Sequence, residues 1–122
     1  MATSELDLLQ GTLDVLVLRA LSWGAMHGYA AARFIRDGSG GSFRILDGAL
    51  YTSLHRMEER GWVASTWGTS DKGKRAKFYQ LTADGRRALT SEAASWERYV
   101  TAVAQVMTAT PDSLATAASH AS

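Results

Sequence analysis

A row of apolar residues in the last third of the chain limits its architecture more than any other feature of the sequence. It predicts a helix over 83–108 whose apolar residues alternate at spacings of four and three, the narrow a/d seam of a coiled coil. At 1.5 Å per residue, the stretch from Asp84 to Met107 would be about 36 Å long, which exceeds the diameter of the ~80-residue body before it. We therefore expect the far half of this helix to pack on another chain. The seam residues are Leu89, Ala93, Trp96, Val100, Val103 and Met107.

Periodic apolar residues predict three helices in the body. The first runs from Leu6 to Leu21, with an alternative start at Thr12, and is apolar on most sides, so it lies at the centre of the core or in a subunit contact. The second covers Gly28–Asp37. The third extends from Asp47, as N-cap, to about Arg60, and a left-handed Gly61 closes it. Its buried face consists of Leu50, Leu54 and Met57.

A basic β-hairpin follows the third helix. Residues 62–67 and 77–82 are rich in β-branched and aromatic side chains, and a Gly- and Lys-bearing segment, 68–76, separates them. The whole chain has a net charge of only +1, yet this hairpin concentrates positive charge against the single acid Asp71. Its basic side chains either meet nucleic-acid phosphates or belong to a solvated turn. They are Lys72, Lys74, Arg75 and Lys77.

Three helices followed by a two-stranded ribbon form the layout of a winged helix-turn-helix. In that layout the third helix enters the DNA major groove and the ribbon touches the flanking backbone. The small residues Gly48, Ala49 and Thr52 near the start of the third helix allow close approach to base edges. We therefore predict a mainly α fold with a small β-hairpin. It comprises a winged helix-turn-helix over 1–82, a C-terminal dimerisation helix over 83–108 and a flexible tail over 109–122.

Two runs of sequence are distinctive, LDGALYTSLHRMEERG over 46–61 and KRAKFYQLTADG over 74–85, with His27-Gly28-Tyr29 upstream. Together they resemble the PadR family of bacterial transcriptional regulators, in its short branch with a single C-terminal helix. The resemblance covers about residues 6–107. It departs at Thr52, where many members carry proline after the Leu-Tyr pair. It implies a homodimer that binds a near-palindromic operator in double-stranded DNA, usually as a repressor, and releases it when an effector arrives.

The resemblance also implies roles for individual residues. On the third helix, Tyr51 and its neighbours would lie at the DNA, and two basic residues of the hairpin would form the wing contact. Lys72 and Lys77 join the wing because of their charge and position. The residues implied by the resemblance are Ala49, Tyr51, Thr52, His55, Lys74 and Arg75.

The residues by themselves leave three of these positions open. The Tyr51 hydroxyl either bonds a neighbouring backbone group or donates to a phosphate. His55 faces outward and either contacts DNA or is an ordinary surface histidine. Arg56 is a further candidate of the recognition helix, and either bonds guanine or pairs with Glu58 or Glu59.

Trp96 also has two interpretations. At a seam position it belongs to the dimer core, where a buried tryptophan supplies a large apolar area, or it offers a stacking surface to a ligand. A multidrug-sensing branch of the resembled family binds flat aromatic compounds between paired tryptophans of this helix. A small aromatic effector at Trp96 is therefore a candidate partner.

The sequence lacks the residues that several other classes of function require. The chain has no cysteine, and His27, His55 and His120 have no acidic companions at ligand spacing, so we predict no metal site and no cofactor. The sequence also lacks the residue sets of an enzyme active site. Its longest apolar stretch, Leu13–Leu21, is shorter than the ~20 residues of a membrane span, and no basic signal-peptide region precedes it. We expect a cytoplasmic protein without a membrane partner.

The low net charge supports a second hypothesis from a different class. The chain would then be a small-molecule-binding or protein-interaction dimer that retains the winged-helix fold without operator recognition. The salt dependence of DNA binding separates the two hypotheses. If the protein binds DNA, its affinity must fall as the salt concentration rises, because counterion release then favours binding less.

Overall fold

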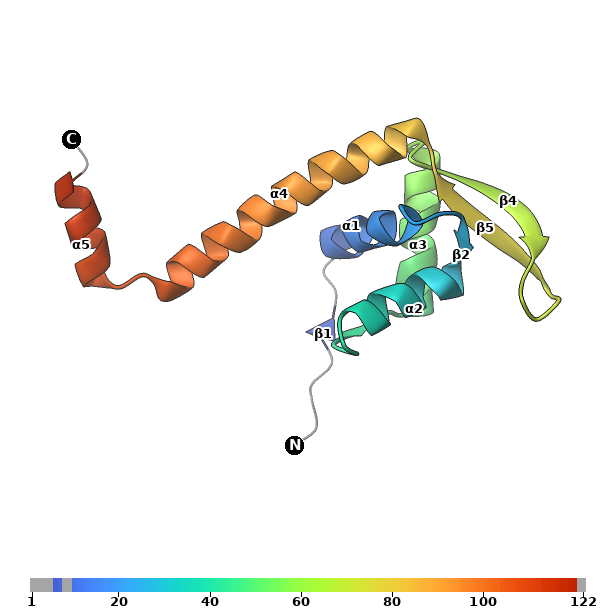
Figure 1. The fold of residues 1–122 in the computed structure, drawn as a ribbon, viewed down its shortest axis with the longest axis horizontal. Coiled ribbons are helices and arrows are strands. Elements are labelled where there is room, and N and C mark those ends of the chain that lie inside the picture. The colour runs from blue at the N-terminus through green and yellow to red at the C-terminus, as the bar shows by residue number, and fades with distance from the viewer. Residues whose placement is uncertain (1–5, 8–9, 121–122) are drawn as a thin grey trace. The chain divides into compact units, whose positions relative to one another are not determined.

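The computed structural model describes residues 6–7 and 10–120. It divides into two compact units with a boundary between Glu92 and Ala93. Within the described residues, no helix combines the length and the apolar character that crossing a membrane requires. The first unit (Figure 1) contains α1 (Gln10–Leu21), α2 (Gly28–Gly38), α3 (Asp47–Glu59), β4 (Val63–Thr69) and β5 (Arg75–Leu81). The second unit contains the C-terminal part of α4 (Ala83–Thr108) and all of α5 (Pro111–His120).

Helix α1 lies at the centre of the first unit's core, as its nearly all-round apolar sequence predicts. It packs on both α2 and α3. Its start differs from the prediction, because Leu6–Asp7 form a strand, β1, that pairs in parallel with β3 (Phe43–Arg44). A helix beginning at Leu6 is therefore wrong, since pairing with a distant segment leaves no trace in local periodicity. The α1 side chains in the core cluster are Leu13, Val17, Leu18 and Leu21.

Helices α2 and α3 form the helix-turn-helix. His27 caps α2, and its Nδ1 accepts a hydrogen bond from the Ala30 backbone N–H at 3.2 Å. The N-cap of α3 is Leu46; Asp47, predicted as the cap, is instead the first helical residue, where its carboxylate still favours the helix dipole. Gly61 has a φ of 78° and follows the end of α3, as predicted. The buried face of α3 contains the predicted Leu50, Leu54 and Met57, together with Ser53.

The predicted hairpin is present, with a shorter tip. β4 and β5 pair antiparallel, with Val63 opposite Leu81 and Thr69 opposite Arg75. The tip is therefore 70–74 and not 68–76, and Gly73 turns it at a φ of 73°. A two-residue strand, β2 (Met26–His27), pairs with the other edge of β5 and so places the start of α2 beside the hairpin. Two residues are too few for a strand pattern, which is why the sequence does not predict β2.

Helix α4 has the bounds that the sequence predicts, Ala83 to Thr108. Thr82 caps it, because its Oγ1 accepts a hydrogen bond from the Gly85 N–H at 3.0 Å. Within the segment predicted as a flexible tail, 109–122, residues Pro111–His120 form a helix, α5. Thr110 and Ser113 cap this helix, because the side-chain oxygen of each accepts a hydrogen bond from the backbone N–H of the other.

Candidate nucleic-acid interface

The face of α3 opposite the core is open to solvent. Four of the five residues predicted to read DNA are exposed on it, because the helical period turns them away from the buried face. Two of them, Ala49 and Thr52, have small side chains. The four exposed residues are Ala49, Tyr51, Thr52 and His55.

Arg56, the fifth predicted residue, has a different environment. Its guanidinium donates to Oδ1 of Asp14 on α1, and the Ser53 hydroxyl donates to the same oxygen at 2.6 Å. The Arg56 and Asp14 side chains are only 22% and 14% exposed. Pairing with a neighbouring glutamate on α3 is therefore wrong, and Arg56 fastens α3 to α1 across the core edge.

Two glutamates of α3 engage basic neighbours. Glu59 Oε1 lies 2.8 Å from His55 Nε2 one turn earlier, and both side chains are exposed. Glu58 Oε1 lies 3.7 Å from the Lys77 Nζ of β5, and Glu58 also accepts a hydrogen bond from the Ser65 hydroxyl of β4. Glu58 therefore links the end of α3 to the hairpin and sets the position of one relative to the other.

The predicted basic cluster divides between the hairpin tip and strand β5. Lys72 and Lys74 are exposed in the tip. Arg75 and Lys77 belong to β5, and their spacing of two residues puts them on one face of the hairpin. The Arg75 guanidinium lies over the Trp67 ring at 4.4 Å from its centroid, so this ring supports the guanidinium at the surface.

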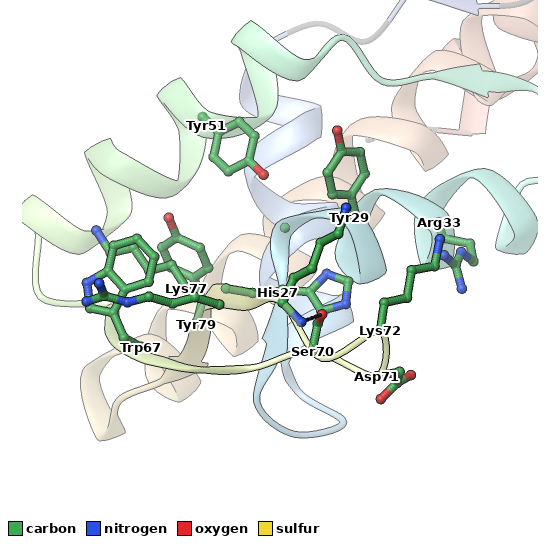
Figure 2. A pocket seen from close by; sticks show the side chains of 14 residues that line it. His27, Tyr29, Arg33, Tyr51, Trp67, Ser70, Asp71, Lys72, Lys77 and Tyr79 are labelled. Atoms are coloured by element: carbon green, nitrogen blue, oxygen red, sulfur yellow. Dashed lines mark hydrogen bonds between the residues drawn. The ribbon is translucent and has the colours of Figure 1, made fainter.

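A cavity of about 710 Å³ opens between these elements. Figure 2 shows side chains of α2, α3 and the hairpin around it. The cavity thus brings predicted residues of the recognition helix and the wing to one place. Its lining consists of His27–Tyr29, Arg33, Tyr51, Trp67, Ser70–Lys72, Lys74–Lys77 and Tyr79.

Tyr51 occupies the wall of this cavity where α3 approaches α2. Its ring points toward the first turn of α2 (Figure 2), and a Cβ on Gly28 would lie 2.9 Å from its hydroxyl oxygen. Glycine at position 28 therefore makes room for the ring. Burial raises the pKa of Tyr51, with further contributions from Tyr29, Tyr79 and Asp47. The hydroxyl stays protonated at neutral pH and is a hydrogen-bond donor beside the basic side chains.

The predicted seam residues of α4 fall into two groups. Leu89 packs against the core of the first unit, and Ala93 is half-buried. Further along, the Trp96 ring stacks on Tyr99 with centroids 5.6 Å apart and planes 19° apart. The remaining seam residues are exposed apolar side chains: Val100, Val103 and Met107.

Sequence reasoning did not assign Asp14, Tyr29, Arg33, Trp67 or Tyr79 to this region. Alternation along the hairpin was an available signal for Trp67 and Tyr79, because Arg75, Lys77 and Tyr79 share one strand face. Asp14 comes from another helix and nothing local marks it, whereas Tyr29 belongs to the His27-Gly28-Tyr29 motif, which carries the resemblance but was given no role at the site. No three His, Cys, Asp or Glu side chains gather as a metal site among the residues that the structure describes.

A three-helix core, an exposed third helix and a basic hairpin beside it define a winged helix-turn-helix protein. The model of the PadR-like family of transcriptional regulators matches residues 17–91, and the chain belongs to this family. Members of the family are transcriptional regulators, not enzymes, in agreement with the sequence prediction.

Solved structures of similar proteins agree with this assignment. A PadR family regulator from Eggerthella lenta is 30% identical, with a TM-score of 0.69 and coverage of 83% of this chain and 86% of that one. A PadR family regulator from Clostridium difficile is 27% identical, with a TM-score of 0.67 and coverage of 78% and 97%. A transcriptional regulator from Clostridium thermocellum is 25% identical, with a TM-score of 0.71 and coverage of 79% and 93%.

Proposed function

We propose that this protein binds an operator in double-stranded DNA as a homodimer and represses transcription. The observation that carries the proposal is the shared cavity, where Tyr51 of α3 and the basic side chains of the hairpin face the same space. A winged helix-turn-helix needs this arrangement, because one DNA duplex must meet the recognition helix and the wing together.

The exposed face of α3 reads the operator in the major groove. Ala49 and Thr52 are small and let the helix approach the base edges, and the Thr52 methyl and hydroxyl groups both contact bases there. The Tyr51 hydroxyl donates a hydrogen bond to a backbone phosphate. His55, held by Glu59 at 2.8 Å, lies one turn further along the same face. Arg56 supports this face through Asp14 and does not bond guanine.

The wing supplies affinity that does not depend on sequence. Lys72, Lys74 and Arg75 neutralise phosphates, and the released counterions favour binding. Lys77 contributes less, because its ammonium group lies 3.7 Å from the carboxylate of Glu58.

The exposed apolar residues of α4 pair with the same residues of a second copy. Val100, Val103 and Met107 would otherwise expose apolar area along one helix. In such a dimer two recognition helices lie about 34 Å apart and meet successive major grooves, which requires a near-palindromic operator. A flat aromatic effector at the Trp96–Tyr99 pair would release DNA if it binds the DNA-free dimer more tightly than the DNA-bound one.

Fluorescence anisotropy tests the proposal directly. The purified protein is titrated into labelled DNA from upstream of its own gene, with scrambled DNA as competitor, at two salt concentrations. We expect tight, sequence-selective binding that weakens with salt. The absence of binding at low salt would overturn operator recognition and favour the ligand-binding or protein-interaction dimer. A promoter–reporter fusion with and without the protein then separates repression from activation.

A further inference from the structure

The cavity beside the wing has the size of a small-molecule site, which binding of a DNA duplex alone does not require. Its volume of about 710 Å³ lies within the range of about 300–1,000 Å³ that small-molecule sites occupy. Its walls come from the start of α2, from Tyr51 of α3 and from the hairpin (Figure 2). Trp96 is not among the residues that line it.

The charge of the lining selects an anion. Lys72, Lys74 and Arg75 reach it from the hairpin and Arg33 from α2, whereas Asp71 is the one acid among the described residues that line it. Lys77 also lines it, with part of its charge engaged by Glu58. A ligand with several negative charges matches this excess of cations.

The rings of the lining select a flat aromatic group. Tyr29 is 63% exposed, and Trp67 is 60% exposed although the Arg75 guanidinium lies over one face of its ring. Tyr79, in contrast, is 6% exposed and packs in the core. Duplex DNA presents phosphates, sugars and base edges to a protein, while its base faces stay stacked inside the helix. Exposed rings beside the cations therefore suit a ligand whose aromatic face is free.

We propose that this cavity binds a small nucleotide, whose base stacks on Tyr29 or Trp67 and whose phosphates bind the basic side chains of the hairpin, and that the bound nucleotide competes with operator DNA. Both parts of such a ligand find their chemistry here, the aromatic base on the rings and the phosphates on Lys and Arg. The competition rests on the proposed DNA-binding function. The nucleotide site does not, because it stands on the lining of the cavity.

Calorimetric titration without DNA tests the site. The full-length protein is titrated with ATP in magnesium-free buffer of constant ionic strength, and separately with tripolyphosphate and with adenosine. We expect ATP to bind about tenfold more tightly than either part alone, because a stacked base and bound phosphates act together. Equal affinity for ATP and tripolyphosphate would mean that the cations merely bind phosphate, which overturns the proposal.

Variants of the aromatic lining residues test whether ATP binds in this cavity. We expect Tyr29→Ala to weaken ATP binding about tenfold through the lost stacking, whereas Tyr29→Phe keeps the ring and the affinity. Trp67→Leu gives the same test on the hairpin side. Trp23→Ala is the matched control, because Trp23 is 68% exposed but does not line the cavity. If Tyr29→Ala and Trp67→Leu both bind ATP like the parent, the nucleotide lies elsewhere and this site is wrong.

A competition experiment tests whether bound ATP displaces operator DNA, separately from whether ATP binds at all. Labelled operator DNA is titrated with protein at increasing ATP, and tripolyphosphate of equal ionic strength serves as the control. We expect the apparent Kd for DNA to rise in proportion to ATP, and Tyr29→Ala to blunt this rise. An unchanged Kd while ATP is bound overturns the competition. ATP binding by a protein that binds no DNA would instead refute the proposed function and leave the nucleotide site supported.

Discussion

The side chain of Asp14 on α1 holds α3 in position on the core. It accepts hydrogen bonds from Arg56 and Ser53, both on α3, while it belongs to α1. Ser53 is buried and the other two side chains are largely so, which makes an unmatched partner costly. The network therefore fixes how α3 lies on the core, and through it the face that α3 presents.

We expect Asp14→Ala to lower the free energy of unfolding by about 2 kcal/mol, because Arg56 and Ser53 lose their common acceptor. Urea denaturation at one fixed protein concentration measures the change, since dimer formation makes stability depend on concentration. Asp37→Ala is the control, because its ion pair with Arg36 is 3.9 Å long and exposed. That variant should change stability by less than about 0.5 kcal/mol, and equal losses in the two variants would contradict a structural role for Asp14.

Gly85 tests close packing at the start of α4. A Cβ at this position would lie 1.9 Å from the Trp62 carbonyl oxygen, which is backbone and cannot move aside cheaply. We expect Gly85→Ala to lower the free energy of unfolding by at least about 2 kcal/mol through overpacking. Gly11→Ala on α1 meets nothing within 4 Å and should be neutral or stabilising by up to about 1 kcal/mol. Thermal denaturation of both variants provides the comparison, and an unaffected Gly85→Ala protein would refute the close approach.

In the proposed complex with DNA, the hairpin and α3 have different roles. The hairpin carries its positive charge in a tip of five residues, 70–74, and in the neighbouring part of β5. Helix α3 carries the small uncharged residues Gly48, Ala49 and Thr52 on its exposed face near its N-terminal end, after Asp47 in the first turn. We therefore expect the hairpin to contact phosphates whatever the DNA sequence, and α3 to contact bases.

Arg75→Ala should weaken binding to every DNA sequence alike. It should also flatten the dependence of log affinity on log salt by about 0.9, the contribution of one neutralised phosphate. Anisotropy titrations at several salt concentrations give the slope. Arg19→Ala removes the same charge from α1, outside the cavity lining, and should leave the slope unchanged. An unaltered slope for Arg75→Ala would remove Arg75 from the phosphate contacts.

Thr52→Ala should act on sequence preference. The variant loses a hydroxyl and a methyl group on the exposed face of α3, so discrimination between operator variants should change by about 1–3 kcal/mol at the affected base pair. Non-specific affinity should stay the same, because no charge is altered. Competition with a set of single-base operator variants measures the preference, and a uniform loss on all sequences would place Thr52 outside base recognition.

At the scale of the whole molecule, α4 is the element on which the proposed dimer rests. Its first turns belong to the first compact unit, where Leu89 packs on the core, and its later residues belong to the second. That second part carries a row of exposed apolar residues, Val100, Val103 and Met107. A second copy of the chain would cover them, which is the basis of the proposed dimer.

Val103→Asp places a charge on this apolar row. We expect sedimentation to show monomers, or the protein to become insoluble, because an unpaired carboxylate would be buried in the contact. Gln105→Asp introduces the same charge off the row and should leave the dimer intact. A Val103→Asp dimer of normal stability would contradict the placement of this face between subunits.

Local sequence determined most of the elements of this protein and their exposed and buried faces. The spacing of Leu50, Leu54 and Met57 predicted which side of α3 is buried, and the bounds of α4 followed from Thr82 and the apolar row. These features are set by neighbours within a few residues of each other, where helical periodicity and capping act directly.

Only the tertiary structure decided which distant residues meet. The parallel pair of β1 and β3, the third strand β2 and the pairing of Asp14 with Arg56 all join segments far apart in sequence. The cavity likewise exists because α2, α3 and the hairpin bring Tyr29, Tyr51 and Trp67 to one place. Short strands and single polar contacts carry no periodic signal of their own, so their partners depend on how the whole core packs.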